Sequence, residues 1–570
     1  MSSRQPVLFA LSVPLAVVLA LGLGWAAAQP VPPAAPDLPA PEFDGGRAQA
    51  DAEAWGAAYP VRVVGSSENA AFRAGLLATL TGLGLEVETQ PFTVTVASQA
   101  RAGVNVIARA PGTGSGPVLL LLAHYDTLPD SGLDNRAGVA ALVELARVFT
   151  SADAGVPLVF AFTDSRAYGQ AWGAKALSET WPAEQPIRAA LSVETRQDQA
   201  GGLLQVDGAG FWFGYAPVWL RQLTREAAAA AGVTAVEPLG LDEALVRALP
   251  FTMRDASLLM GRGVPAVTLS VGPEALSAQA LSALGQTAEL WVRGLAARRE
   301  AEPASAWAGW RLDDARVLPA WAARVASLLL LTPLFLATGL ELWARRPRWS
   351  AVWPELLALA GALAPLLNAY AVAFVLVRVN VLPRYEWFPA APGDRFLLQP
   401  TDWAMLVLLA FVGLSAWDIF YRERGWGRWA DQRPNVERNV ALLGAFSGLA
   451  LLVWGLNDFA AVLFLLPAAW LWPWIAPRPV PAGRILNGLL AVGGLLGLLA
   501  VFIGVALTPG LGLWWWFLTA GAMYGLIPAP VVLVWAVFIA LWVRFLRLGT
   551  RSLDAVSAHP VGLSPYDGHK

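Results

Sequence analysis

The sequence predicts an α/β domain followed by an α-helical membrane domain of several spans. The apolar run 118–123, bounded by turn residues, is typical of a strand buried on both faces of a parallel sheet. Between about residues 50 and 300, further strand-like runs alternate with helical patterns, which indicates a mostly parallel sheet between two helix layers, an α/β/α sandwich. From about residue 319, apolar runs of membrane-spanning length dominate.

Composition restricts the class of protein. The 570 residues are 56% hydrophobic and include 27 Trp, and the mean hydropathy is +0.51, values that do not suit a wholly soluble protein. The chain has no Cys, which excludes disulfides, thiolate metal ligands and cysteine nucleophiles. Net charge is −2 and no basic stripe with interleaved aromatic residues occurs, so we expect no nucleic-acid partner.

The N-terminus carries an export signal. Arg4 precedes an apolar run, 7–28, that ends in small residues, so 1–29 reads either as a cleaved signal peptide or as a retained membrane anchor. Both alternatives export the residues that follow. The Pro- and Ala-rich stretch 30–49 is predicted to be a linker.

The segment 50–300 is predicted to be the extracytoplasmic α/β domain. Its elements are read from helical spacing of apolar residues, from alternation, and from short apolar runs. The predicted helices are 67–85, 139–148, 221–231 and 281–297, and the predicted strands are 87–96, 104–108, 118–123, 157–162, 187–193 and 264–271.

A second linker, 301–318, is predicted to lead into a membrane domain, 319–548, of seven or eight helices, with 549–570 as a polar tail. Each apolar run is long enough to cross the hydrocarbon core, and the last is too long for a single straight crossing. The runs are 322–343, 352–377, 403–421, 440–456, 459–476, 485–507 and 512–545. The lipid bilayer is therefore an expected partner.

Arginine placement predicts the orientation. Arginines gather after the first, third and fifth predicted spans, which places those loops on one side, and the positive-inside rule makes that side cytoplasmic. The domain 50–300 is then extracytoplasmic, as the N-terminal signal also indicates. Arg544, Arg547 and Arg551 favour a cytoplasmic C-terminus and hence seven spans.

Candidate site residues follow the buried strand 118–123. His124 and Asp126 stand at alternate positions and so leave the same face, and Asp134-Asn135 opens the next helix. The carboxyl ends of parallel strands are where α/β sheets place their ligand sites. The other two histidines, His559 and His569, lie in the polar tail. His124 is thus a candidate metal ligand, with a purely structural histidine as the alternative.

These motifs resemble those of the co-catalytic zinc aminopeptidase family, which also includes glutamate carboxypeptidase, glutaminyl cyclase and the non-enzymatic transferrin receptor. The resemblance covers roughly residues 55–298 and rests on His124-Tyr-Asp126, Asp134-Asn135-x-x-Gly138, and the upstream runs 62–66 and 105–112. It implies a zinc-aminopeptidase-like α/β/α sandwich.

The resemblance also implies roles for single residues. His124 would be a zinc ligand and Asp126 the carboxylate that orients it. Asp134 would match the bridging ligand, and Glu194 the acidic ligand that shares the metal of His124.

The second metal subsite departs from the family pattern. An adjacent Glu-Glu pair, base then ligand, should follow the strand 157–162, but the chain reads Asp164-Ser165-Arg166. The family's final histidine is also absent, and Glu274 occupies its region, whereas Asp255 stands where the family usually has an Asp. The resemblance therefore implies at most one zinc ion, held by His124, Asp134 and Glu194, and weak or no peptide hydrolysis.

Three functional hypotheses remain open. The first is an active single-metal peptidase in which Asp164 or Glu274 replaces the base. The second is a binding or structural module, in which the degenerate site holds a peptide or small peptide-like ligand, a single ion or a partner domain. The third is a transporter with an accessory ectodomain. The predicted spans contain almost no charged residues, which disfavours this hypothesis.

Overall fold

The computed structural model describes residues 5–31, 38–96, 99–111, 116–128, 134–152, 154–166, 171–195, 204–210, 214–249, 254–272, 276–298, 309–347, 349–379, 381, 400–419, 435–476, 480–507, 527 and 529–550. The chain forms two compact units. We call them the globular unit, residues 27–323, and the helical unit, which comprises Met1–Ala26, Arg324–Glu386 and Phe396–Lys570.

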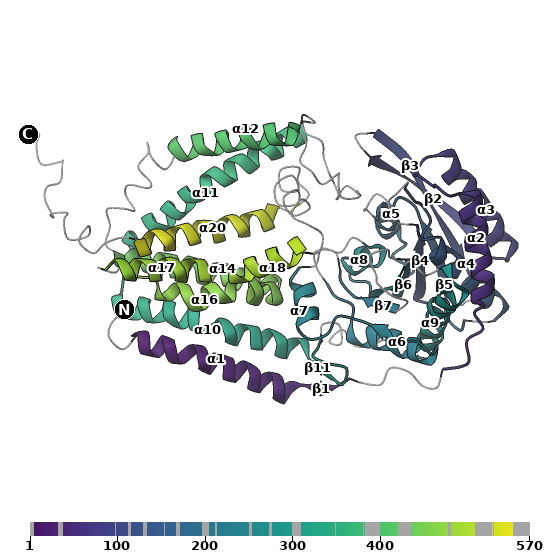
Figure 1. Ribbon diagram of the computed structural model, residues 1–570, viewed down its shortest axis with the longest axis horizontal. Coiled ribbons are helices and arrows are strands. Elements are labelled where there is room, and N and C mark those ends of the chain that lie inside the picture. Colours follow the sequence, from purple (N-terminus) through teal and green to yellow (C-terminus); the bar gives the residue numbers. More distant parts are fainter. Residues whose placement is uncertain are drawn as a thin grey trace, which may run out of the picture. The chain divides into compact units, whose positions relative to one another are not determined.

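An eight-stranded mixed sheet forms the centre of the globular unit, with strand order β2-β3-β5-β4-β6-β9-β7-β8 (Figure 1). The four central strands β5, β4, β6 and β9 run parallel, and antiparallel pairs join them to β3 on one side and β7 on the other. The strands are β2 Glu86–Val96, β3 Gln99–Arg109, β4 Val118–His124, β5 Leu158–Thr163, β6 Ile187–Thr195, β7 Leu204–Asp207, β8 Ala235–Val236 and β9 Ala266–Val271.

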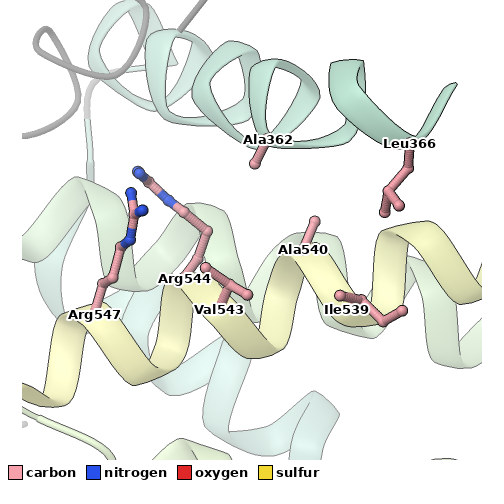
Figure 2. A pocket seen from close by; sticks show the side chains of 7 residues that line it. All are labelled: Ala362, Leu366, Ile539, Ala540, Val543, Arg544 and Arg547. Carbon is pink, nitrogen blue, oxygen red and sulfur yellow. The ribbon is translucent and has the colours of Figure 1, made fainter. Parts of the chain in front are cut away.

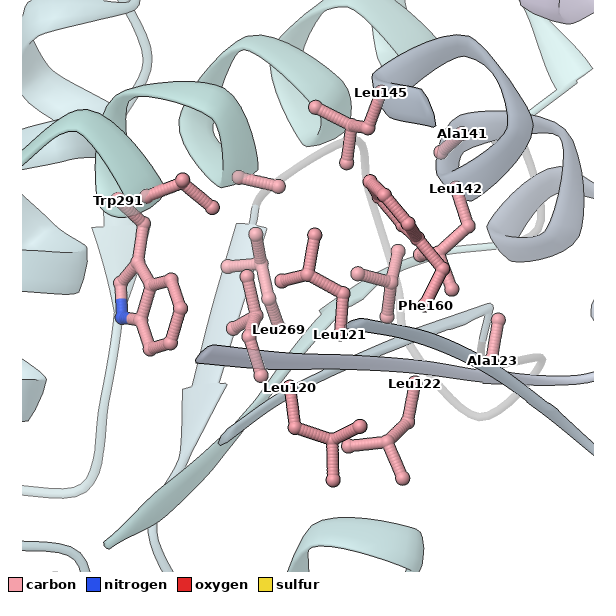
Figure 3. Packing of buried hydrophobic residues seen from close by; sticks show 14 of the residues in the cluster. Leu120, Leu121, Leu122, Ala123, Ala141, Leu142, Leu145, Phe160, Leu269 and Trp291 are labelled. Atoms are coloured by element: carbon pink, nitrogen blue, oxygen red, sulfur yellow. The ribbon is translucent and has the colours of Figure 1, made fainter. Parts of the chain in front are cut away.

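Strand β4 is buried along its whole length because helices cover both faces of the sheet. In Figure 3, Leu121 points toward α4 (Arg136–Ser151), while Leu120 and Leu122 point to the opposite face. Trp291 of α9 (Ala278–Ala297) packs on the α4 side. Full burial of each leucine contributes roughly 1.5–3 kcal/mol, which explains why this run is apolar without alternation.

Two groups of helices form the outer layers. Helices α2, α4 and α9 pack together, and α6 packs on α9, whereas α5 and α8 pack on each other. Besides α4 and α9, the helices are α2 Gly45–Ala58, α3 Ser67–Gly82, α5 Trp172–Thr180, α6 Val218–Ala230, α7 Leu241–Ala248 and α8 Asp255–Met260.

The four predicted helices and six predicted strands of this domain are present, with ends shifted by a few residues. Helices α2, α5, α7 and α8 were not predicted, since they are short or lack a clear apolar stripe. Helix α2 starts at Gly45, inside the segment 30–49 that the sequence assigned to a linker, and the Asp44 side chain caps it by accepting from the backbone N–H groups of Gly46 and Arg47.

A second, three-stranded sheet of the globular unit joins the two ends of that unit. Strand β1 (Gln29–Pro30) pairs antiparallel with β11 (Arg316–Leu318), which pairs with β10 (Trp310–Arg311). The chain therefore enters and leaves the globular unit at adjacent strands, one of which lies in the stretch 301–318 that the sequence treats as a linker.

The helical unit contains apolar helices. Five helices in the described part of the chain are long and apolar enough to cross a membrane: Pro6–Ala27, Ala320–Ala344, Val352–Arg378, Arg438–Leu456 and Ala529–Gly549. They lie in α1 Gln5–Ala27, α10 Ala320–Arg345, α11 Trp349–Arg378, α14 Asn435–Leu456 and α20 Ala529–Thr550.

The remaining predicted spans correspond to shorter elements. Run 403–421 contains α12 (Pro400–Trp417), 459–476 contains a helical stretch over Asp458–Trp474 with a π-helical segment, and 485–507 is divided between α17 (Pro481–Gly493) and α18 (Leu496–Leu507). Residues 512–526 of the last predicted span lie outside the described residues. The number of spans therefore remains a prediction.

A buried charge cluster corrects one expectation about the helical unit. Glu355 of α11 and Arg544 of α20 lie inside predicted spans, yet both are almost fully buried. The Glu355 Oε2 atom accepts hydrogen bonds from Arg544 Nη2 at 2.9 Å and from Arg438 Nε of α14 at 3.3 Å. The expectation that the spans contain almost no charge is therefore wrong for these helices. The ion pairs of Glu355 hold α11, α14 and α20 together.

Candidate metal centre

His124 and Asp126 lie where the strand alternation predicts. His124 ends β4, its side chain is 4% exposed, and its Nδ1 atom lies 3.5 Å from Asp126 Oδ1. That distance is longer than an ordinary hydrogen bond, and within the described residues His124 Nδ1 makes no hydrogen bond. Asp126 Oδ1 accepts from the backbone N–H of Arg166 at 2.8 Å. The Asp126 carboxylate therefore lies next to the His124 imidazole, and it also accepts a hydrogen bond from the loop after β5.

Asp134 is bound by two arginines. Its Oδ1 atom accepts from Arg62 Nη2 at 2.5 Å and from the backbone N–H of Arg136 at 3.1 Å, and its Oδ2 atom lies 3.3 Å from Arg136 Nε. Arg62 is fully buried and also donates to the backbone carbonyls of Tyr125 and Tyr59, at 2.6 and 2.7 Å. Both carboxylate oxygens, the atoms that would bridge two metals, thus face guanidinium groups.

Glu194 lies near the carboxyl end of β6, buried close to a third arginine. Arg254 Nε is 4.0 Å from Glu194 Oε2, and Arg254 Nη1 is 3.0 Å from Asp207 Oδ2 at the end of β7. Ser192 Oγ donates to Glu194 Oε1 over a long 3.4 Å. Charges of both signs therefore lie close together around Glu194.

Asp255, at the start of α8, lies near Glu194. It is fully buried, and its Oδ2 atom accepts from Thr163 Oγ1, at the end of β5, at 2.6 Å. Burial, followed by repulsion from Glu194, raises the pKa of Asp255 to about 6, while the Arg166 guanidinium and the nearby His124 side chain act in the opposite direction. Asp255 is therefore close to His124, Glu194 and Arg166.

Asp164 is saturated with hydrogen bonds. Its Oδ1 atom accepts from Asn69 Nδ2 (3.1 Å) and the Ser165 N–H (2.8 Å), and its Oδ2 atom accepts from Tyr125 Oη (3.0 Å) and the Val104 N–H (3.1 Å). Burial, with a smaller contribution from the Asp126 carboxylate, raises its pKa to about 7. These bonds connect α3, β3 and the loops after β4 and β5. The geometry favours a structural role over that of a replacement base.

The loop after β5 is where the resemblance implies a Glu-Glu pair, and its backbone is strained. Ser165 is buried and has a φ of 66°, in the left-handed region that serine rarely adopts. Such strain is typical of functional sites. Ser165 lies between Asp164 and Arg166, and the backbone N–H of Arg166 donates a hydrogen bond to Asp126 Oδ1. The turn therefore brings an arginine, and no second carboxylate, to this edge of the sheet.

The donor set fits zinc only in part. An imidazole and two carboxylates are suitable zinc ligands in type. However, among the described residues no group of three or more His, Asp or Glu side chains is arranged to hold a metal ion, and Asp134 is engaged by Arg62 and Arg136. Among the described residues, His124, Asp134 and Glu194 fit one ion only if Asp134 is released from its arginines. Glu274 lies outside the described residues.

Sequence reasoning missed the residues that restrain the candidate ligands. Arg62 and Asn69 belong to the segment upstream of the sheet, and Arg254 precedes the predicted acidic position 255. The only available signal was the run 62–66, which supported the resemblance without indicating that Arg62 would pair with Asp134.

Comparisons with known proteins bear on the fold of the globular unit. Residues 105–287 match the sequence profile of peptidase family M28. The globular unit therefore contains an M28 metallopeptidase-like domain, which supports the zinc-aminopeptidase-like family. No curated protein matches the sequence.

Solved structures similar to the chain include glutaminyl cyclases and an exopeptidase. The structure of Fimbriiglobus ruber glutaminyl cyclase shares 19% sequence identity with this chain and has a TM-score of 0.38. The match covers 45% of this chain and 97% of the cyclase chain. The structure of an Acidobacteriales bacterium glutaminyl cyclase is 21% identical with a TM-score of 0.38, covering 47% and 99%. A Zn-dependent exopeptidase from Parabacteroides distasonis is 18% identical with a TM-score of 0.36, covering 45% and 99%.

The raised pKa of Asp164 predicts a pH dependence of stability. An unfolded Asp titrates near 3.8 and folded Asp164 near 7, so between these values the folded state holds a proton that the unfolded state has lost. The stabilisation is present below about pH 4 and is lost as the pH rises through 7. Asp164→Asn removes the titration, so the stability of the wild type relative to this variant should fall by at least about 1.4 kcal/mol between pH 5 and pH 8, the equivalent of one pKa unit.

Thermal unfolding of the full-length protein in detergent at several pH values measures this difference. Asp242→Asn, at an exposed position of α7, is the matched control and should not change the pH dependence. A difference between wild type and Asp164→Asn that stays constant over this pH range would contradict the assignment.

Proposed function

We propose that this chain is a membrane-embedded protein whose exported M28-like domain has little or no peptidase activity and serves as a binding module. The single observation that carries the proposal is the turn Asp164-Ser165-Arg166. There the resemblance implies a general base and a metal ligand, and the chain has a saturated carboxylate and an arginine. An arginine remains protonated in proteins and can act neither as a base nor as a zinc ligand.

Hydrolysis by the family mechanism needs both missing parts. A base must take a proton from the attacking water, and loss of a general base alone typically costs about 10²–10⁴ in rate. The second metal would also lack its ligands. Asp164 is a poor replacement for the base because four hydrogen-bond donors already occupy its two oxygens, which argues against the single-metal peptidase.

Charges of both signs lie close together at the carboxyl ends of the strands and would suit a peptide-like ligand. Glu194 and Asp255 can attract an ammonium group, and Arg166 and Arg254 can attract a carboxylate. A peptide terminus or a small zwitterion presents these groups close together. This complementarity supports a peptide or small peptide-like ligand.

At most one zinc ion is proposed, on His124, Asp134 and Glu194, with Asp126 positioning the imidazole. Binding must break the pairs of Asp134 with Arg62 and Arg136, which lowers the affinity for the ion. When bound, zinc would act as a Lewis acid toward a carbonyl group.

The alternative of a transporter has weaker support. The buried Glu355, Arg438 and Arg544 lie near the ends of their helices and pair with one another, an arrangement that suits helix packing better than a path across the membrane.

The first prediction concerns hydrolysis. Full-length protein in detergent with added zinc should show no chelator-sensitive turnover of aminoacyl or peptidyl substrates above background, because the base and the second subsite are missing. His124→Ala is the matched control and should give the same rate. Chelator-sensitive turnover at least about 10²-fold above that of His124→Ala would refute the proposal.

The second prediction concerns zinc affinity. Arg136→Ala removes one cation from Asp134 and should tighten zinc binding by about tenfold, the equivalent of one charge-assisted hydrogen bond. Arg225→Ala, which removes a similarly exposed arginine elsewhere in the globular unit, should bind zinc as the wild type does. Titration calorimetry measures both. Equal affinities of Arg136→Ala and wild type would remove the assigned role of Arg136.

The third prediction concerns orientation, which rests on the arginine pattern. A phosphatase reporter that is active only after export should be active when fused after Arg298, at the end of the domain, and inactive when fused after Arg428, in the loop after the third predicted span. Activity at Arg428 would overturn the proposed orientation.

A further inference from the structure

Exposed apolar side chains gather in one short stretch of the globular unit. In the helical unit they are common, as at Leu366 of α11 and Ile539 of α20 (Figure 2), which is expected of helices long and apolar enough to cross a membrane. In the described part of the globular unit between β1 and β11, the clearly exposed large apolar side chains are Val236, Leu241 and Leu245, at 43%, 78% and 44%. We call these three side chains the α7 patch, since Val236 closes β8 and the two leucines belong to α7.

Helix α7 has the opposite polarity to an ordinary amphipathic helix at a protein surface. Leu241 and Leu245 lie one turn apart and are exposed, whereas Glu243 and Arg247, also one turn apart, are buried on the other face. A surface helix in water normally turns its apolar face to the core and its charges to the solvent. The reversed arrangement indicates that the outward face of α7 meets an apolar environment.

Ion pairs beneath α7 fix the helix in this orientation. Glu243 Oε1 lies 3.1 Å from Arg221 Nη2 of α6 and 2.6 Å from Arg247 Nη2. Arg247 Nη2 also donates to the Gly309 carbonyl, and the backbone N–H of Arg311 in β10 donates to Glu243 Oε2 at 3.2 Å. Turning the helix to bury its leucines would separate these buried charges from their partners, which is strongly unfavourable. The charged interior therefore keeps the leucines outside.

The start of α7 is bonded to the three-stranded sheet. The Gly240 N–H donates to the Arg311 carbonyl of β10 at 2.8 Å, and the Gly240 carbonyl accepts from Trp310 Nε1 at 2.8 Å. Gly240 has a φ of 55°, and a Cβ atom at this position would lie 3.1 Å from the Leu312 carbonyl oxygen, so the contact favours glycine. Since β10 pairs with β11 and β11 with β1, α7 is connected to the strands at both ends of the globular unit.

One residue separates this sheet from each of two long apolar helices. Ala28 lies between α1 and β1, and Pro319 lies between β11 and α10. Both helices contain segments long and apolar enough to cross a membrane. Trp25 and Trp321, within one turn of these helix ends, are exposed, and tryptophan is enriched at the membrane–water interface. The sheet that holds α7 therefore lies within a few residues of the level at which both helices would leave the bilayer.

We propose that the α7 patch inserts into the bilayer interface near these ends of α1 and α10 and holds the globular unit against the membrane. The inference rests on the membrane-embedded part of the proposed function and is independent of zinc or peptide binding. A lipid interface supplies the apolar environment that the inverted helix requires. The one basic residue of α7, Arg247, is buried, so the contact does not require anionic lipid.

The test uses the absence of Cys from the chain, because one introduced cysteine can then be labelled at a single position. Leu241→Cys and Leu245→Cys carry an environment-sensitive fluorophore in the full-length protein, in phosphatidylcholine nanodiscs with or without a nitroxide near the head of one acyl chain. An interfacial helix buries its apolar face about 5–10 Å into the headgroup region, so both labels should emit at shorter wavelength and be quenched by the nitroxide lipid.

Ala74→Cys is the matched control, at an exposed position of α3. Helix α3 packs on β2 and β3, at the opposite edge of the eight-stranded sheet from β8, so this label should not be quenched. Quenching at Leu241 and Leu245 no greater than at Ala74 would overturn the inference. A shift to shorter wavelength without quenching would also overturn it, because protein rather than lipid would then cover the patch.

A label at Leu336→Cys, an exposed position within α10, separates this inference from the proposed function. If the Leu336 label is quenched and the α7 labels are not, the chain is embedded in the membrane and this inference alone is wrong. If the Leu336 label is not quenched either, the membrane-embedded part of the proposed function fails, and this inference fails with it.

A substitution at Leu241 tests the patch directly. With the fluorophore on Leu245→Cys, Leu241→Asp places a carboxylate against the bilayer and should reduce the quenching, whereas Leu241→Met keeps an apolar side chain and should retain it. Leu241 is the first residue of α7 and is exposed, and an acidic residue at a helix N-terminus is favourable, so Leu241→Asp should leave the helix folded. Unchanged quenching in Leu241→Asp would contradict insertion of the patch.

Discussion

The candidate site depends on the parallel pairing of β5, β4, β6 and β9. Because these strands run in the same direction and in a fixed register, their carboxyl ends meet at one edge of the sheet. His124 pairs with Thr163 across β4 and β5, and Glu194 with Ser270 across β6 and β9. Polar side chains from four strands are thus brought together at the edge of a sheet whose interior is apolar, and α8 adds Asp255 to them.

Carboxylates gathered in a buried place repel one another unless cations compensate them. In a two-zinc site the metals do this. Here guanidinium groups are in contact with or close to several of these carboxylates: Arg62 and Arg136 at Asp134, Arg254 near Glu194, and Arg166 near Asp255. The arginines are covalently part of the chain, so these carboxylates can be compensated without a bound metal. A site stabilised in this way retains the fold, and the fold alone does not confer the chemistry.

The sequence predicted those parts of the fold that follow from periodicity. The apolar run of β4, the alternation that puts His124 and Asp126 on one face, and the helix after Asp134 were all readable from neighbouring residues. The pairs that decide the chemistry were not, since Arg62 meets Asp134 across 72 positions and Glu355 meets Arg544 across 189. No local pattern encodes such contacts. The short helices α5, α7 and α8 were missed because tertiary packing stabilises them more than their own apolar spacing does.

The central claim is that arginine takes the place of the second metal at the edge of the sheet. Anomalous diffraction at the zinc absorption edge, from crystals of the full-length protein grown with excess zinc, tests it most directly. The account predicts at most one zinc peak, beside His124 and Glu194, with the Arg166 guanidinium close to Asp255. Two zinc peaks about 3.5–4 Å apart, the spacing of two-metal hydrolases, with Asp134 bridging them, would contradict it.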